Sequence, residues 1–289
     1  MGTLTASFML FGCRLEGIFK SAEKQVSNSI DFANRVAKEV KQALSKSGES
    51  SLFSLNLVKV TMPGEMNPPM PVLSRNRFGM AIDLDLCNGC GECIYACNLE
   101  NNIPLVTQEE SAKGRFLHWI SMVDGVPVMC GHCSFAPCEK VCPTGAATHT
   151  PDGLSTMVYK RCAGSRFCGA NCPINARKFN YNNAQELGLS YQFNPKVPLR
   201  TAKVMEKCSL CIQRLQDDRL RHKTVLDSEW DGRGVKTACA AACPKKAITF
   251  GNWLNPESEL VKVARGREIY APKALAHLDP SVVYLKGKR

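Results

Sequence analysis

The feature that most constrains this chain is a cysteine-rich motif that occurs four times, once in a broken form. The chain has 289 residues and 16 cysteines, far more than a globular protein usually carries. All of them except Cys13 belong to a motif: Cys87, Cys90, Cys93 and Cys97; Cys130, Cys133, Cys138 and Cys142; Cys162, Cys168 and Cys172; Cys208, Cys211, Cys239 and Cys243. The third motif has Ser165 at the position of the second cysteine. This repeat indicates metal-binding modules rather than a disulfide scaffold, because disulfide-rich domains are usually short chains.

The spacing within the motifs is typical of iron–sulfur ligation. A C-x-x-C-x-x-C loop supplies three thiolates to one cluster, and a fourth must come from elsewhere. In two-cluster bacterial ferredoxins the fourth ligand is the cysteine before a proline, which reaches across to the other cluster. The cysteines in that position are Cys97, Cys142, Cys172 and Cys243, and all but Cys97 precede proline. A zinc site has no use for a third close cysteine or a trailing Cys-Pro, so zinc is the weaker interpretation.

This reaching rule predicts that the motifs bind clusters in pairs. We expect the first motif to pair with the fourth and the second with the third, so that one module is nested inside the other. The expected ligand sets are Cys87, Cys90, Cys93 and Cys243; Cys97, Cys208, Cys211 and Cys239; Cys130, Cys133, Cys138 and Cys172; and Cys142, Cys162 and Cys168.

Ser165 leaves three alternatives for the last of these sets. The corner beside it is empty and the cluster has three irons; or its alkoxide binds a fourth iron, although oxygen is a harder and poorer ligand there; or the motif binds no cluster. We expect the first alternative. The chain then carries three [4Fe-4S] clusters and one [3Fe-4S] cluster, with about 15 iron atoms in all.

The formal charge of +11 suggests a nucleic-acid or anionic-membrane partner, but the clusters offset it. Each oxidised cluster with its thiolates sums to about −2, so four of them remove roughly 8 units and leave about +3. The basic excess is therefore interpreted as counter-charge for buried anions, and no nucleic-acid partner is expected.

Five basic residues crowd the third motif: Lys160, Arg161, Arg166, Arg177 and Lys178. Either they raise the potential of its cluster, because positive charge stabilises the reduced state, or they serve only as solubilising counter-charge. His132 lies between Cys130 and Cys133, where its ring either hydrogen-bonds a sulfur or simply packs.

Residues 1–70 contain no motif. Apolar residues at helical spacing predict an amphipathic helix from about Leu15 to near Gly48, which packs on its own domain, grips a partner or lies on a membrane surface. The Pro-rich stretch from Met62 to Pro71 predicts an extended linker. No run of 18 apolar residues predicts a membrane span, and the apolar segment before Cys13 is too short for a signal peptide. Cys13 is interpreted as a packed apolar residue rather than a lipidation site.

The expected fold class is α+β, with two nested bacterial-ferredoxin-like modules and an N-terminal helical arm. The outer module comprises residues 78–110 and 200–255, the inner module residues 111–199, and a C-terminal extension, 256–289, packs on a partner or on the domain. Short strands are expected at GMAIDL, VPVM, STMVY and AITFG, and helical turns after the last cysteine of each motif. The charged segment from Gln213 to Lys236 predicts a surface helix and loop, either an interface or a solvated excursion.

From about Phe78 to Arg289 the chain resembles the four-cluster iron–sulfur subunits of the molybdopterin oxidoreductase superfamily, such as those of dimethyl sulfoxide reductase and polysulfide reductase. VPVMCGHCSFAPCEKVCPTGA and RCAGSRFCGANCPINARKFNY are similar to the family's second and third motifs. KCSLCIQRL, VKTACAAACPKKAITFG and DPSVVYLKGKR are similar to the iron–sulfur subunit of alternative complex III and of the quinone reductase complex of sulfate reducers. In that branch the third motif also lacks its second cysteine.

The resemblance implies an electron-transfer subunit that is not an enzyme on its own. It implies as partners a large molybdopterin-type subunit, a quinone-binding integral membrane subunit and a multihaem cytochrome c. It also implies a peripheral position on a bacterial inner membrane, on the periplasmic face through export with a partner, with the inner module toward the membrane. The alternative is the same kind of subunit in a molybdenum enzyme for polysulfide, nitrate or formate. A radical enzyme acting alone is not expected, because the chain lacks a C-x-x-x-C-x-x-C loop.

Overall fold

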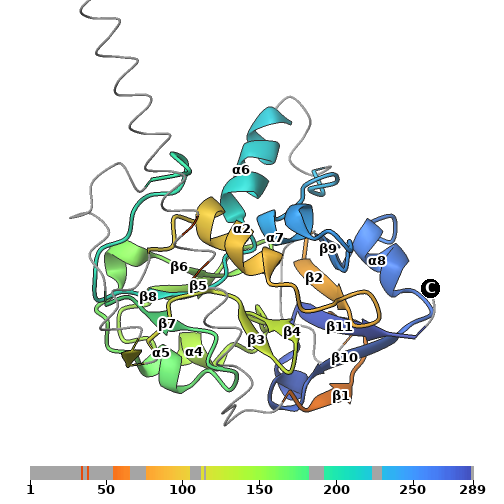
Figure 1. Cartoon of the computed structure of the whole chain (residues 1–289), viewed down its shortest axis with the longest axis horizontal. Helices are drawn as coiled ribbons and strands as arrows, with labels where there is room; N and C mark the ends of the chain where they lie inside the picture. The colour runs from red at the N-terminus through yellow and green to blue at the C-terminus, as the bar shows by residue number, and fades with distance from the viewer. Residues whose placement is uncertain are drawn as a thin grey trace, which may run out of the picture.

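The computed structural model describes residues 55–65, 76–104, 112–113, 115–181, 192–222 and 230–287, together with Asn34 and Lys38. Within these ranges the chain is a mixed α and β protein built from short elements (Figure 1). The expected amphipathic helix lies outside the described residues except for Asn34 and Lys38, which are helical and exposed. Cys13 and residues 66–71 of the expected linker also lie outside them.

A five-stranded sheet occupies the right-hand part of Figure 1. Its strands are β1 (Leu57–Lys59), β10 (Glu268–Pro272), β11 (Val282–Lys286), β2 (Phe78–Asp83) and β9 (Ile248–Asn252), in that spatial order. Neighbours are antiparallel except β11 and β2, which are parallel with Val282 opposite Met80. Strands β2 and β9 confirm two of the predicted strands. The joining of residues 57–59 and 268–286 to the same sheet is not predicted by the sequence.

Strand β2 is central because both of its faces are covered. All six of its residues are buried, as expected for a strand with neighbours on both sides and covered faces. On one face the ring of Phe78 lies 5.9 Å from Phe250 and 5.4 Å from Trp230. Helix α8 (Glu259–Ala264) packs on β2 and β9. A Cβ at Gly79 would lie 2.2 Å from the carbonyl oxygen of Ser281, so only glycine fits in this crossing.

The remaining strands form three hairpins or two-stranded ribbons. They are β3 (Ser121–Val123) with β4 (Val126–Val128), β5 (Ala147–His149) with β6 (Ser155–Met157), and β7 (Lys178–Phe179) with β8 (Met205–Glu206). Strands β4 and β6 confirm the other two predicted strands. Asp124 and Gly125 join β3 to β4 with φ of 51° and 76°, the left-handed conformation that a two-residue hairpin turn requires.

A short helix begins one residue before the third cysteine position of each motif. These helices are α2 (Glu92–Glu100), α4 (Pro137–Lys140), α5 (Phe167–Ala170) and α7 (Ala238–Ala242). The prediction of helical turns after the last cysteines holds only for the first motif, because in the other three the helix ends before the last cysteine. In the last three the Cys-Pro step ends the helix, because proline disfavours helical backbone in the residue before it. The first motif has no proline, and α2 runs on through Cys97. Helix α2 packs on α7, and α4 packs on α5.

The charged insertion begins with the predicted helix, α6 (Ile212–Arg221). Its far end returns to the core, since Trp230 is 7% exposed and its indole N–H donates to Asp218 Oδ2 at 2.8 Å. The guanidinium of Arg219 lies 4.4 Å from the Trp230 ring centre. The described end of the insertion is thus packed on the protein and is not a solvated excursion.

Two further short segments complete the described chain. The 3₁₀ turns are η1 (Tyr159–Arg161) and η3 (Lys273–Leu278).

The start of the expected extended linker is instead a tight turn, because the Met62 N–H donates to Glu65 Oε2 at 3.2 Å and Gly64 takes a φ of 96°. The Gly64 N–H also donates to Asp279 Oδ1 at 3.3 Å, which ties this turn to the residue that directly follows η3.

Candidate iron–sulfur centres

The 15 described cysteines are all free thiols, and they lie in four groups of close neighbours. In the first group, burial raises the pKa of Cys93 to about 12, and the thiols of Cys87, Cys90 and Cys243 add to the effect. In the second group, burial raises the pKa of Cys97 well above its usual value, and Cys208, Cys211 and Cys239 raise it further. Each group therefore joins residues from both ends of the described chain.

The third and fourth groups come from the middle of the chain. Burial raises the pKa of Cys133, and the thiols of Cys130, Cys172 and Cys138 raise it further. Burial also raises the pKa of Cys168, where Cys162 and Cys142 are the neighbouring thiols that add to it. In every group one thiol comes from a different motif than the rest: Cys243, Cys97, Cys172 and Cys142.

Burial disfavours the thiolate at several of these positions. It raises the pKa of Cys138 and Cys211 to about 11 and that of Cys239 to about 12. At Cys142 burial acts in the same direction, but backbone N–H groups that include those of Ala147 and Thr144 bring its pKa below the usual value. Only the thiolate is a metal ligand, so a metal that binds the buried groups must displace protons.

Backbone N–H groups are aimed at the sulfur atoms from several sides, as around a bound thiolate cluster. Each donates to a cysteine Sγ over 3.3–3.4 Å: His132 to Cys130, Ala176 to Cys172, Met205 to Cys162, Leu210 to Cys208, Ala238 to Cys211 and Ala247 to Cys243. At Cys172 and Cys243 the donor is in each case the N–H four residues later, in the loop that follows the Cys-Pro step. Donors to sulfur stabilise negative charge on a cluster and its ligands.

The four groups follow one another in a row. Cys93 of the first group is close enough to raise the pKa of Cys239 in the second, which burial raises most. Cys208 of the second group is similarly affected by Cys130 of the third. The third and fourth groups share Arg177, whose charge lowers the pKa of both Cys138 and Cys168 against the larger effect of burial.

Two buried polar side chains lie where the second and third groups meet. His132 is fully buried, and its Nε2 lies 3.0 Å from the carbonyl oxygen of Cys208. Its Nδ1 is also buried and has no hydrogen-bond partner among the described residues, so the contact of the ring with a sulfur stays a prediction. Lys207 is 2% exposed, and its ammonium donates to the carbonyl oxygens of Ser155 and Cys208. Sequence analysis misses Lys207, because nothing in its spacing distinguishes it from a surface lysine.

The two ends of the row reach the surface. At the first group Cys90 and the neighbouring Leu86 are exposed. At the fourth group Phe167 is 57% exposed, and Val158 is exposed as well. Ser165 is exposed on the third-motif loop, between Gly164 and Arg166, which both have positive φ.

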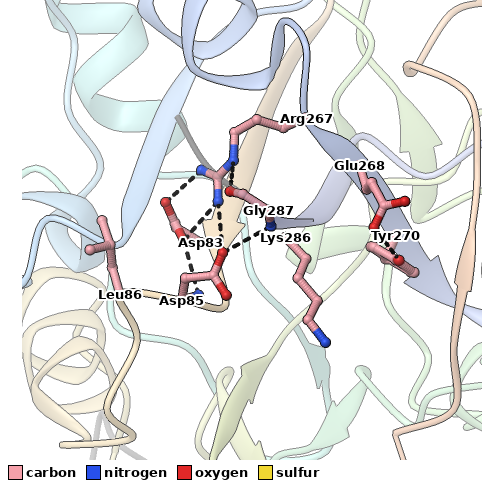
Figure 2. Close-up of a pocket in the computed structure, with 8 residues that line it drawn as sticks. All are labelled: Asp83, Asp85, Leu86, Arg267, Glu268, Tyr270, Lys286 and Gly287. Atoms are coloured by element: carbon pink, nitrogen blue, oxygen red, sulfur yellow. Dashed lines mark hydrogen bonds and ion pairs between the residues drawn. The ribbon is translucent and has the colours of Figure 1, made fainter.

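A pocket of about 530 Å³ lies beside the first motif, where β2 and β11 end and β10 begins, and no cysteine lines it (Figure 2). Its charges largely neutralise one another. The guanidinium of Arg267 reaches between Asp83, at 2.6 Å, and Asp85, at 3.3 Å. Within the described ranges no three His, Cys, Asp or Glu side chains are grouped tightly enough for a single metal ion. Thiols that cap the corners of a cubane stand farther apart than ligands of one ion.

The thiol groups fit iron–sulfur clusters by their chemistry. They provide three or four sulfur ligands each, N–H donors to those sulfurs, and one buried guanidinium between two groups. Across the described segments, none of the helices has the length and apolar character needed to cross a bilayer.

Comparison with known proteins identifies the same chemistry. Residues 86–146 match the 4Fe-4S dicluster domain. The chain is 35% identical over 231 residues to the iron–sulfur cluster-binding subunit of menaquinone reductase from Nitratidesulfovibrio vulgaris, covering 73% of this chain and 89% of that protein.

Two further relatives extend the comparison. Iron–sulfur subunit 1 of the Hdr-like menaquinol oxidoreductase from Archaeoglobus fulgidus is 32% identical, over 75% of this chain and 86% of that protein. A polysulfide reductase subunit from Wolinella succinogenes is 28% identical, over 74% and 96%. These relatives confirm the resemblance found in the sequence. The chain belongs to the family of iron–sulfur electron-transfer subunits of quinone and molybdoenzyme oxidoreductase complexes, which are not catalytic subunits by themselves.

Proposed function

We propose that this chain is the iron–sulfur subunit of a membrane-bound quinone oxidoreductase complex, in which it holds three [4Fe-4S] clusters and one [3Fe-4S] cluster. The proposed ligand sets are the four thiol groups. Bound there, the clusters would supply one-electron transfer. The chain itself contributes thiolates, N–H donors and burial, and it keeps the groups in a fixed order.

The observation that carries this proposal is the crossing of one cysteine from each motif into a neighbouring group. Cys243 lies with the first motif and Cys97 with the fourth, and Cys172 and Cys142 cross between the second and third. The packing of α2 on α7 and of α4 on α5 supports the same nested arrangement of an outer and an inner module. Crossing is the ligation pattern of two-cluster ferredoxins.

The three-iron assignment rests on the composition of the fourth group. Three thiols lie together there, and the exposed Ser165 occupies the position at which the other motifs have their second cysteine. A hydroxyl is a poor substitute for a thiolate at iron in such a cluster. The other three groups have four thiols each and suit four-iron clusters.

The exposed ends of the row are the proposed contact points for two different partners. The end at Cys90 and Leu86 is assigned to a large molybdopterin-type subunit. The end at Phe167 is assigned to a quinone-binding membrane subunit on the periplasmic face of the membrane, and a multihaem cytochrome c is proposed as a further partner. Relatives named as menaquinone reductase and menaquinol oxidoreductase subunits support the quinone assignment. A relative named as part of polysulfide reductase supports the second candidate, a subunit of a molybdenum enzyme.

The test is purification of the tagged chain with its partners from membranes in mild detergent. We expect about 15 iron atoms per chain, an oxidised-state EPR signal of a three-iron cluster, and reduction of that signal by added menaquinol under anaerobic conditions. Haem c in the complex together with reduction of the clusters by menaquinol favours the quinone oxidoreductase, whereas oxidation or reduction of polysulfide by the complex favours the second candidate. A colourless protein with stoichiometric zinc would overturn both.

A further inference from the structure

Arg177 differs from the other basic residues near the third motif because its side chain is buried. It is 3% exposed, whereas Lys160, Arg161 and Arg166 are exposed. The residue directly precedes β7, and the N–H of the preceding Ala176 donates to Cys172 Sγ at 3.3 Å. The backbone that carries this guanidinium is thus attached to a thiol of the third group.

Outside the thiol groups, the described residues offer the guanidinium of Arg177 few acceptors. Its Nη1 donates to the thioether of Met157 at 2.7 Å, which is a weak acceptor. Its Nε and Nη2 are buried and, among the described residues, have no hydrogen-bond partner of good geometry. An arginine cannot shed its charge, and burying a cation without acceptors is costly, so this position implies a negatively charged occupant.

The neighbouring carboxylate does not fill that role. Burial raises the pKa of Glu139, but the hydrogen bond and charge of His149 bring it below its usual value, and Arg177 is near enough to lower it a little further. Both of its oxygens are already engaged, one with His149 Nδ1 at 2.6 Å and the other with the Ser155 hydroxyl at 2.8 Å. What remains beside the guanidinium are thiols of two different groups, Cys138 and Cys130 of the third and Cys168 of the fourth.

From this geometry we infer that Arg177 is a positioning residue shared by the third and fourth groups, with its two free donors directed at sulfur of both clusters. The inference rests on the proposed function, since it requires clusters in both groups. Reduction adds negative charge to a cluster, and a buried cation and N–H donors stabilise that state. Arg177 therefore raises the reduction potentials of both clusters together. A planar guanidinium can serve two acceptors in this way, whereas an ammonium cannot reproduce its fork.

The experiment is an EPR-monitored redox titration of the purified complex with R177Q, R177K and the control R161Q. Arg161 carries the same charge beside the same motif but is exposed. In R177Q we expect the midpoint potentials of both clusters to fall. At a fixed potential the ratio of reduced to oxidised cluster should drop about tenfold or more, which corresponds to about 59 mV for a one-electron couple. R177K should restore part of the shift, and R161Q should leave both midpoints near those of the wild type.

The outcomes separate this inference from the proposed function. Normal iron content and EPR signals with a shift of only one cluster, or of neither, would overturn the shared role while leaving the clusters in place. Missing iron in the wild type would instead overturn the proposed function. If neither Arg177 variant assembles clusters, wild-type protein labelled with guanidino-¹⁵N arginine decides. Pulsed EPR should then detect ¹⁵N coupling at the oxidised fourth-group cluster and at the reduced third-group cluster, and its absence at either contradicts the inference.

Discussion

The cysteines before proline have an effect outside the motifs that contain them. Cys142 belongs to the second motif in sequence, but it lies with Cys162 and Cys168 of the third. Its local N–H donors lower its pKa against the effect of burial, so it loses its proton more readily than an ordinary thiol. A substitution at this residue should therefore be felt in the neighbouring motif.

Replacing Cys142 by alanine should remove the three-iron cluster and leave the four-iron cluster of the second motif in place. The physical reason is that the fourth group has only three thiols and cannot lose one. The iron content should fall by about three atoms per chain, and the oxidised-state EPR signal should disappear. Cys13→Ser, outside all motifs, is the control and should lose no iron. Loss of the second-motif cluster instead would contradict the crossing.

Replacing Ser165 by cysteine should convert the three-iron cluster into a four-iron cluster. The substitution supplies the thiolate that the other motifs have at this position, and soft thiolate is the preferred ligand of iron in such clusters. Iron should rise by about one atom per chain, and the oxidised three-iron signal should be replaced by a signal that appears only on reduction. Ser165→Ala should leave the wild-type signal intact. A loss of the signal in the alanine variant would indicate that the serine oxygen is itself a ligand.

At the scale of elements, the third-motif loop is held against the ribbon of β7 and β8. Gly164 has a φ of 67°, and a Cβ there would lie 2.2 Å from the carbonyl oxygen of Lys203, which precedes β8. The Met205 N–H then donates to Cys162 Sγ at 3.4 Å. The close approach of loop and ribbon is thus the means by which this ribbon supports the fourth group.

Gly164→Ala should therefore weaken the fourth group specifically. A side chain at this position must displace backbone, in addition to the cost of about 1 kcal/mol for a positive φ in an L-residue. The three-iron EPR signal per chain should fall well below the wild-type level while the reduced four-iron signals persist. Gly145→Ala is the matched control, since Gly145 has a φ of 60° and open space around it. Equal losses in the two variants would show that the φ alone is responsible.

A buried ion pair joins the end of β2 to the residue before β10, and so connects two strands of the sheet. Arg267 contacts Asp83 at 2.6 Å, and both side chains are almost fully buried. Burial opposes ionisation of Asp83, but the hydrogen bond and charge of Arg267 bring its pKa below the usual value. By contrast, the Lys59–Glu268 pair on the same sheet is exposed.

Asp83→Asn should lower the free energy of unfolding by about 2–4 kcal/mol, because the buried guanidinium of Arg267 then keeps only its 3.3 Å contact with the exposed Asp85. The Asp83 pKa is lowered in the folded state, so its stabilisation is complete above the unfolded value of about 4 and is lost only as the pH falls through the folded value. The difference between wild type and variant in denaturant unfolding should therefore be constant from about pH 8 to pH 5. Glu268→Gln, at the exposed pair, should cost less than about 1 kcal/mol. If the difference in unfolding free energy between wild type and Asp83→Asn became smaller between pH 8 and pH 5, the lowered pKa of Asp83 would be contradicted.

How much the sequence predicts differs between site and sheet. Cysteine spacing leads to a definite prediction of which thiols share a cluster, because ligand geometry restricts the pairing of motifs, and this ligation stays a prediction. The strands at VPVM, STMVY and AITFG are likewise recognisable from local composition. Strand β1 is not, because it has three residues and its partner β10 follows about 200 positions later. The burial of Arg177 is equally invisible, since five basic residues near the third motif look alike in sequence.

At the scale of the whole molecule, the parts of the chain differ in how much of their core is cysteine. Around α8 the core contains no cysteine and consists of Ala81, Trp253, Leu260, Val261, Ala264, Ile269, Val283 and Leu285. The core between α4 and α5 is only Ala136, Cys138, Cys168 and Met205. Apolar burial therefore stabilises the α8 face of the sheet without metal. The other core that β2, β9 and β11 share includes Cys93, Cys97, Cys130, Cys208 and Cys239, and the part around α4 and α5 depends most on what its thiols bind.

Removal of iron by a chelator should unfold the segment around α4 and α5 before the sheet. Hydrogen exchange followed by mass spectrometry should show early loss of protection in residues 136–181, while amides of β2, β9 and β11 stay protected longer. The reason is that small domains with few apolar residues rely on metal for folding. The holo protein in the same buffer is the control. Simultaneous loss of protection in both regions would show that the clusters stabilise the molecule as one cooperative unit.

The thiol groups also differ in how much of the chain must exist before they are complete. During translation the third and fourth groups have all their sulfurs once Cys172 has emerged from the ribosome, but the first and second must wait for Cys243 and Cys239. Domains form in order of synthesis when their residues are contiguous. A nascent chain can thus be loaded in the middle first, and the polypeptide that follows closes the outer pair around a centre that is already built.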